Sequence, residues 1–146
     1  MSIEENKALI RRLNSVTNSH DADACAACYA PDATNHGHRV GREGLRTVMT
    51  DIFTTFPDGH TTIDEMVAEG DVVVSRSTTT ATHLGTPIVR NIHNMKGIPP
   101  TGKSVIMKGI HIWHIKDGLI TSHMAARDDL ETMRQIGLWP PPSLSA

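Results

Sequence analysis

The sequence predicts an α+β protein in which N-terminal helices pack on the concave face of a curved, antiparallel or mixed sheet. Apolar residues recur at helical spacing in the first third of the chain, and they alternate with polar residues after the Phe56-Pro57-Asp58-Gly59 turn. Asp117-Gly118 lies between two alternating segments, which is typical of a β-hairpin. Helices followed by consecutive strands favour the α+β class. A long, twisted sheet around the helices would form a cone that is open at one end.

Three helices are predicted before the sheet. Apolar side chains recur at helical spacing near the N-terminus: Ile3, Leu9, Ile10, Leu13 and Val16. They predict a first helix over residues 3–17. Asp21 can cap a short second helix that ends at Tyr29. A short strand or irregular segment over residues 33–40 then leads to a third helix over residues 45–53.

Strands rich in Thr and Val are predicted next, at residues 61–68 and 72–84. The segment 85–103 has several glycines and prolines and little periodicity. It is too long for an ordinary hairpin loop, so we expect a lid there. The hairpin around Asp117-Gly118 follows, and a short helix near residues 129–135 ends the fold.

Length and charge limit the possible functions. The 146 residues are enough for one domain with its own core, and we expect a single domain over residues 1–146. The net charge of −2 and the scattered basic residues argue against a nucleic-acid or membrane partner. No segment is apolar over the length of a membrane span, and the charged N-terminus is unlike a signal peptide. We therefore expect a cytoplasmic protein.

Cys25 and Cys28 form a CxxC motif inside an alanine-rich helical pattern. Redox motifs of this kind follow a strand and open a helix, and one CxxC supplies only half of a zinc site. We interpret both cysteines as core residues.

The hairpin places histidines among apolar residues. On the first strand, alternation puts His111 and Trp113 on one face and Ile110, Ile112 and His114 on the other. On the returning strand, Thr121, His123 and Ala125 form one row, and the other row comprises Ile120, Ser122 and Met124. The sequence therefore predicts a small polar pocket in an otherwise apolar sheet.

His111 and His123 are the first candidates for catalysis, because an imidazole exchanges protons near neutral pH. Either could instead be a buried neutral histidine bonded to the backbone. Asp128 is a third candidate, since burial could raise its pKa and make it a base. As an alternative, Asp128 precedes a helix and would be its N-cap.

Other polar residues allow two interpretations each. His36 and His38 could form a metal site with His83, His93 or His123, but no carboxylate spacing completes a known ligand set, and we expect no metal. Asn35 could orient a substrate carbonyl or simply form a turn. Trp113 and Trp139 could line the pocket or cover an interface.

Six short motifs occur in order along most of the chain. They are Phe56-Pro57-Asp58, Ala68-Glu69-Gly70-Asp71, Thr82-His83-Leu84-Gly85, Gly97-Ile98-Pro99-Pro100-Thr101-Gly102-Lys103, Asp117-Gly118-Leu119-Ile120 and Arg134-Gln135-Ile136-Gly137. Together they resemble the SnoaL-type polyketide cyclases of the ketosteroid-isomerase-like superfamily, also named after nuclear transport factor two. The resemblance implies a cone-shaped barrel, usually oligomeric, with a deep pocket for a hydrophobic substrate. It also implies ring closure by an intramolecular aldol reaction without metal or organic cofactor.

The resemblance also implies site residues, and one of them is missing. Asn35 matches a pocket asparagine of the family, and His111 matches a pocket histidine. The family's cyclases have their catalytic aspartate in the final strand, two residues after a histidine and three before a second aspartate. This sequence has His123 and Asp128 at the flanking positions but Ala125 in place of the acid. Alanine cannot accept a proton, so the usual cyclase mechanism is not available in that form.

The leading hypothesis is a homodimeric, cofactor-independent enzyme that performs acid–base chemistry on a hydrophobic carbonyl compound. Cyclisation, isomerisation, hydration or dehydration would all fit. We expect His111, His123 and Asp128 to carry the chemistry, and Asn35, His83, Trp113 and Ala125 to contact the substrate. The alternative is a non-catalytic protein that binds a hydrophobic metabolite. An interaction module that uses the open sheet face is a third hypothesis, although the sequence shows no large apolar stripe to support it.

Overall fold

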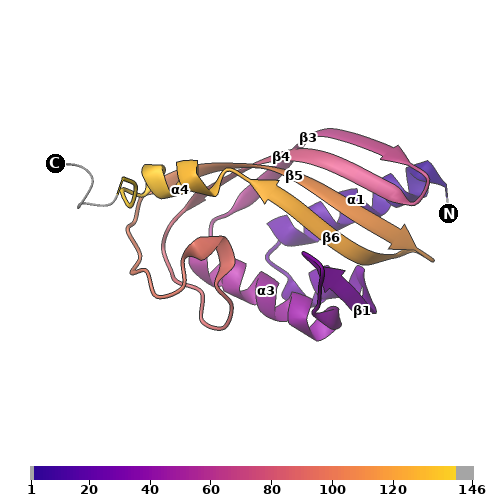
Figure 1. Cartoon of the computed structure of the whole chain (residues 1–146), viewed down its shortest axis with the longest axis horizontal. Coiled ribbons are helices and arrows are strands. Elements are labelled where there is room, and N and C mark those ends of the chain that lie inside the picture. The colour runs from indigo at the N-terminus through magenta and orange to yellow at the C-terminus, as the bar shows by residue number, and fades with distance from the viewer. Residues whose placement is uncertain (1, 141–146) are drawn as a thin grey trace.

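A six-stranded mixed sheet forms one layer of the protein, with the order β2-β1-β6-β5-β4-β3 (Figure 1). The computed structural model describes residues 2–140. The strands are β1 (Tyr29–Asn35), β2 (His38–Arg39), β3 (His60–Glu69), β4 (Val72–Thr82), β5 (Ser104–Lys116) and β6 (Leu119–Arg127). The helices are α1 (Ile3–Asn18), α2 (Ala22–Ala27), α3 (Gly41–Thr55), α4 (Asp129–Gln135) and the short 3₁₀ helix η1 (Ile92–Asn94). The predicted α+β class is confirmed.

The helices begin where the sequence offers caps. Ser2 and Glu5 form a capping box at α1, and the Asp21 side chain accepts a hydrogen bond from the Ala24 amide at the start of α2. The third helix is longer than predicted at both ends, since α3 runs from Gly41 to Thr55. Helix α1 packs on β3, and α3 packs on α2 and β1. Together they cover one face of the sheet, which we call the inner face.

Strand β1 makes the sheet mixed. It starts at Tyr29, where the sequence predicted the end of a helix, and it runs parallel to β6. In this register Asn35 is the neighbour of His123, 88 residues later in the chain. The pairing places Asn35, the last residue of β1, directly beside His123, the predicted pocket histidine.

The remaining strands form an antiparallel meander in which β5 is the longest strand. The predicted hairpin is present, and Asp117 and Gly118 both have positive φ angles of 51° and 76°, as a type I′ turn requires. His111 and Trp113 lie on the inner face as predicted, with Trp113 buried between its exposed neighbours Ile112 and His114.

A β-bulge at Thr121 corrects one predicted row. Ile115 pairs with Ile120, but the preceding His114 pairs with Ser122, so Thr121 is an extra residue on β6. The bulge turns Ile120 to the inner face, where it is fully buried. The prediction that Ile120 shares a row with Ser122 and Met124 was therefore wrong, because strict alternation cannot anticipate an inserted residue.

Most of the core lies between the helices and the inner face. Its larger cluster comprises Ile10, Leu13, Cys25, Cys28, Tyr29, Ala30, Ala33, Leu45, Met49, Val73, Trp113, Ile115 and Ile120. A second cluster under α4 comprises Phe56, Ala81, Met95, Val105, Met107 and Ile136. Both cysteines are free and buried, and burial raises the pKa of Cys25 to about 11, so the core interpretation of the CxxC motif is confirmed.

The outer face of the sheet is partly apolar, contrary to the expectation of no apolar stripe. Ile106, Ile110 and Met124 are each about half exposed there, and Ile112 is 38% exposed. These residues alternate with inward-facing ones and belong to two strands, β5 and β6. They are therefore not consecutive in the sequence, and the apolar stripe is not visible there. No helix within residues 2–140 is long and apolar enough to cross a membrane.

The segment between β4 and β5 is anchored to α3 by a buried carboxylate. The Asp51 side chain, 2% exposed, accepts hydrogen bonds from the amides of Ile88 (2.9 Å), Val89 (3.1 Å) and Arg90 (2.7 Å). At the start of the segment, a Cβ on Gly85 would collide with the Thr54 carbonyl oxygen, so only glycine permits this close approach. The first part of the predicted lid region, residues 85–90, therefore packs against α3 as a wall.

Candidate active site

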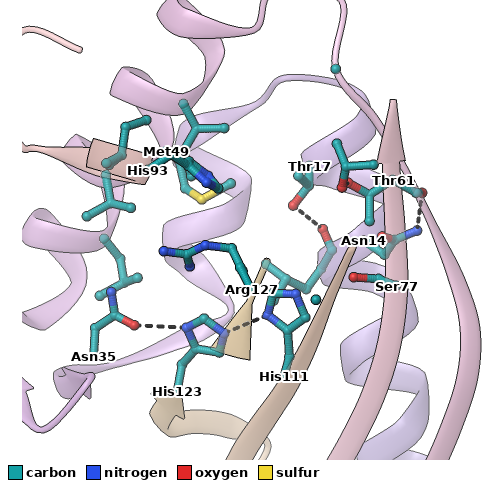
Figure 2. A pocket seen from close by; sticks show the side chains of 18 of the residues that line it. Asn14, Thr17, Asn35, Met49, Thr61, Ser77, His93, His111, His123 and Arg127 are labelled. Carbon is teal, nitrogen blue, oxygen red and sulfur yellow. Dashed lines mark hydrogen bonds between the residues drawn. The ribbon is translucent and has the colours of Figure 1, made fainter. Parts of the chain in front are cut away.

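A cavity of about 530 Å³ lies between the inner face and helices α1 and α3. Its walls are mainly apolar, and the larger side chains are Ile10, Leu13, Tyr29, Leu45, Met49, Ile52, Phe53, Phe56, Ile63 and Trp113. This volume suits a small organic ligand. A polar group lines one side, where Asn14 donates to the Thr61 carbonyl at 3.2 Å (Figure 2).

Three side chains form a hydrogen-bonded chain on the opposite side. His123 Nδ1 lies 2.8 Å from Asn35 Oδ1, and His123 Nε2 lies 3.0 Å from His111 Nδ1 (Figure 2). The residues come from three neighbouring strands, β1, β6 and β5. Sequence reasoning identified all three residues, and the structure brings them together.

The hydrogen bonds determine which ring nitrogens of His111 and His123 carry a hydrogen. Asn35 Oδ1 only accepts, so His123 Nδ1 carries a hydrogen and its neutral Nε2 accepts from His111 Nδ1–H. His111 Nε2 then carries a free lone pair. That atom has no hydrogen-bond partner within residues 2–140. It is also not one of the polar side-chain atoms that the protein shields completely from solvent, so it is open to the cavity.

Burial keeps both histidines neutral. It lowers the pKa of His111 from 6.5 to about 4, with further lowering by the positive charge of Arg127. Burial also lowers the pKa of His123 to about 3, and the neighbouring His111 adds to this effect. The indole of Trp113 stacks on the His111 ring at 5.2 Å between centroids and on the His123 ring at 5.4 Å. This stack restrains both rings.

Arg127 and His93 extend the site beyond the predicted residues. Arg127 Nε lies 3.3 Å from an oxygen of Asp129, and the same oxygen lies 3.6 Å from His93 Nδ1. Arg127 and His93 both line the cavity. Arg127 could have been found from the sequence, since it continues the row of His123 and Ala125 by alternation. His93 gave no such signal, because it lies in the irregular segment.

A buried hydroxyl is a further residue that sequence reasoning missed. Ser75 on β4 lines the cavity and is the cross-strand neighbour of His111. Its Oγ is enclosed and has no hydrogen-bond partner among the described residues. An unpaired buried hydroxyl is costly, and because this oxygen is shielded it is not itself open to the cavity.

Three predicted site residues lie elsewhere. Asp128 caps α4 by accepting from the Glu131 amide at 3.1 Å, it is exposed, and it does not line the cavity, which is the alternative role that the sequence allowed. His83 is fully buried behind the cavity, where its Nδ1 accepts from the Thr101 amide at 3.3 Å. Ala125 pairs with His111 across β5 and β6, but it is not one of the lining residues.

The remaining histidine candidates do not assemble a metal centre in the described part of the chain. His36 and His38 both line the cavity near His123, and the His36 and His123 rings meet edge to face at 5.8 Å. Within residues 2–140, no three His, Cys, Asp or Glu side chains are grouped so that they could hold a metal ion.

Comparison with known proteins gives the family. The model of the SnoaL-like polyketide cyclase family matches residues 7–136, which is most of the chain. The chain belongs to this family. No sequence among the curated proteins matches it significantly. The expectation from the six motifs is therefore confirmed at the level of family and fold.

Solved structures with a similar fold agree with this assignment. AclR from Streptomyces galilaeus, described as a candidate hydroxylase, is 25% identical with a TM-score of 0.80, and the match covers 95% of this chain and 100% of AclR. TsrD from Streptomyces laurentii is 28% identical with a TM-score of 0.80, covering 94% and 98%. IdmH from Streptomyces antibioticus, described as a candidate polyketide cyclase, is 27% identical with a TM-score of 0.74, covering 91% and 99%.

Proposed function

We propose that this SnoaL-like protein is an enzyme that transfers a proton on a hydrophobic carbonyl compound without a cofactor. The reaction would be a cyclisation, an isomerisation, or a hydration or dehydration. The observation that carries this proposal is the Asn35–His123–His111 chain, which ends in an unprotonated Nε2 open to an apolar cavity. A neutral imidazole with a fixed tautomer is a suitable general base.

In the proposed step, His111 Nε2 takes the proton from the carbon next to the substrate carbonyl. The C–H bond breaks, an N–H bond forms, and the electron pair moves to the carbonyl oxygen as an enolate. The new imidazolium keeps its Nδ1–H on His123 Nε2, and Asn35 holds the His123 tautomer. The proton then returns from His111 to another carbon or to an alkoxide, which leaves the enzyme unchanged.

Electrostatics make this step reasonable despite the low pKa of His111. The same Arg127 charge that disfavours the imidazolium in the free protein would stabilise a neighbouring enolate. Once the enolate forms, its negative charge also stabilises the imidazolium.

Two hypotheses follow from the presence of alanine, and not an acidic residue, at position 125. If the family's aspartate is the only possible base, this protein binds a hydrophobic metabolite without converting it. If His111 has taken over that role, the protein remains an enzyme. We favour the enzyme, because a binding protein would not require an aligned chain of three polar side chains in an apolar wall.

Hydrogen–deuterium exchange of a bicyclic ketone tests the proposal. In deuterium oxide the protein should accelerate loss of the C2 proton signal of 1-tetralone, followed by proton NMR. His111→Gln should slow this exchange by roughly 100-fold, the usual scale for losing a general base. His114→Gln is the matched control, since His114 is exposed on the outer face of the same strand, and it should keep the full rate.

The same experiment tests the alternative hypothesis of a protein that binds a hydrophobic metabolite without converting it. Binding of 1-tetralone measured by calorimetry, without any faster exchange, would support the binding protein and overturn the enzyme. A His111→Gln variant with unchanged melting temperature and full exchange rate would remove His111 from the mechanism.

We also propose that the protein forms a homodimer through the outer face of the sheet. The exposed residues Ile106, Ile110, Ile112 and Met124 support this, because contiguous apolar surface on a soluble domain commonly marks an interface. A second copy of the chain would cover them in a symmetric contact.

A further inference from the structure

The charges around the cavity are all of one sign. None of the residues that line it in the described part of the chain is Asp or Glu, whereas Arg90 and Arg127 are both present. Lys108 also borders the cavity, but alternation along β5 turns its side chain away from the face that carries His111. The histidines that titrate low add no charge near neutral pH. The apolar cavity therefore has a net positive lining.

Arg127 is the cation closest to the proposed base. Its side chain is 29% exposed, and its Nε is occupied by Asp129 at 3.3 Å. The terminal nitrogens of its guanidinium make no hydrogen bond to any residue within 2–140. In Figure 2 the Arg127 guanidinium is drawn above the His111–His123 pair, among the other side chains that line the cavity. Arg127 thus offers a planar pair of free donors beside the catalytic chain.

Gly109 allows the side chains of His111 and Arg127 to lie close together. It is the cross-strand neighbour of Arg127, and it precedes His111 by two residues on the inner face. A Cβ on Gly109 would lie 3.2 Å from His111 Nε2 and 3.3 Å from Arg127 Cγ. The missing side chain of Gly109 therefore lets His111 Nε2 and the stem of Arg127 lie close to the same point of the strand.

A purely structural role does not account for this arrangement. Asp129 lies outside the cavity lining, and its single contact with Arg127 uses only Nε. A guanidinium beside two buried imidazoles disfavours their protonation, so it does not assist the dyad in the free protein. A negative ligand would compensate the charge, and a planar carboxylate matches the two free donors of a guanidinium.

From this juxtaposition we infer that the natural ligand is a hydrophobic carboxylate, held by Arg127 with its reactive carbon next to His111 Nε2. The inference rests on the proposed function for the location of the site and adds the substrate class. Ala125 fits this assignment. An aspartate on the same face as His111 would repel the ligand, and alanine at position 125 removes that repulsion.

Binding of two probes of nearly equal shape tests the inference. 2-Naphthoate is an anion, and 2-naphthamide is its neutral counterpart. Calorimetry at pH 7 should show that the wild-type protein binds naphthoate at least tenfold more tightly than naphthamide, the usual scale of a charge-assisted hydrogen bond. Arg127→Gln should reduce this preference to about twofold or less, and Arg127→Lys should restore part of it. Lys116→Gln, an exposed cation outside the cavity, should leave the preference unchanged.

Each outcome is decisive. Equal binding of both probes by the wild type would overturn the carboxylate assignment, while the proposed base would still be tested by ketone exchange. A preference that persists in Arg127→Gln would overturn the role of Arg127. Failure of both probes to bind would overturn the assignment of the cavity as the site of a hydrophobic carboxylate.

Discussion

Replacement of Asp51 by Asn should loosen the wall that carries part of the cavity. Asp51 is buried, and its two oxygens accept from three consecutive amides, those of Ile88, Val89 and Arg90. Asparagine keeps one acceptor oxygen, but its side-chain NH₂ group cannot accept a hydrogen bond from the backbone amides that face it. Loss of one or two charge-assisted hydrogen bonds, at roughly 1.5–3 kcal/mol each, should destabilise the segment by about 3 kcal/mol.

Two measurements check this magnitude. If the segment opens together with the whole protein, the melting temperature should fall by roughly 10 °C, at about 2–4 °C for each kcal/mol in a domain of this size. If it opens locally, hydrogen exchange should accelerate at the amides of residues 88–90 and much less in β5. Asp32→Asn is the control, because Asp32 is exposed and makes no side-chain hydrogen bond to the described residues.

The consequence should reach the ligand site, since Arg90 and His93 belong to the anchored segment and line the cavity. Weaker binding of 2-naphthoate by Asp51→Asn is therefore expected. Unchanged melting temperature together with unchanged exchange at residues 88–90 would refute the view that Asp51 holds this wall in place.

Three further perturbations follow from the same structure. Because burial lowers the pKa of His111 and His123, the unfolded chain binds more protons between pH 6.5 and about 4, so stability should fall with decreasing pH, by roughly 2 kcal/mol for each histidine and about 4 kcal/mol in total from pH 7 to pH 5. Urea midpoints that do not change over this range, or that change equally in His111→Gln, would contradict this. Ala125→Asp should place a carboxylate beside His111, which raises the pKa of that histidine and weakens 2-naphthoate binding. NMR titration measures the first effect and calorimetry the second. An unchanged His111 pKa would mean that residue 125 does not face His111. Ile110→Lys should convert the proposed dimer to a monomer in light scattering, and a wild type that is already monomeric would end the dimer proposal.

The sequence predicted most elements of this fold, because periodicity and turn chemistry are local. The Asp117-Gly118 turn set the register of β5, and the alternation correctly assigned His111 and Trp113 to one face. The bulge at Thr121 could not be predicted, since no local residue type marks it. The parallel pairing of β1 with β6 depends on long-range packing, and no pattern near Asn35 indicates that it lies beside His123.

The candidate site was predicted less completely than the fold. Motif position and alternation identified Asn35, His111, His123 and Trp113, all of which line the cavity. His93 comes from an irregular segment whose path is determined by the anchor at Asp51. Irregular segments have no periodicity, so their contribution to a site appears only in three dimensions.

The proposed base depends on the Asn35–His123–His111 chain, which leaves the Nε2 lone pair of His111 free in the cavity. Nitrogen-15 NMR of the imidazole rings tests it directly, because protonated and unprotonated ring nitrogens have different chemical shifts. At pH 7 we expect a neutral His111 with hydrogen on Nδ1 and none on Nε2, and a titration near pH 4. Asn35→Ala should release the tautomer of His123 and broaden or shift the His111 signals. A His111 that carries hydrogen on Nε2, or that is a cation at pH 7, would contradict the proposed role of His111 as the base.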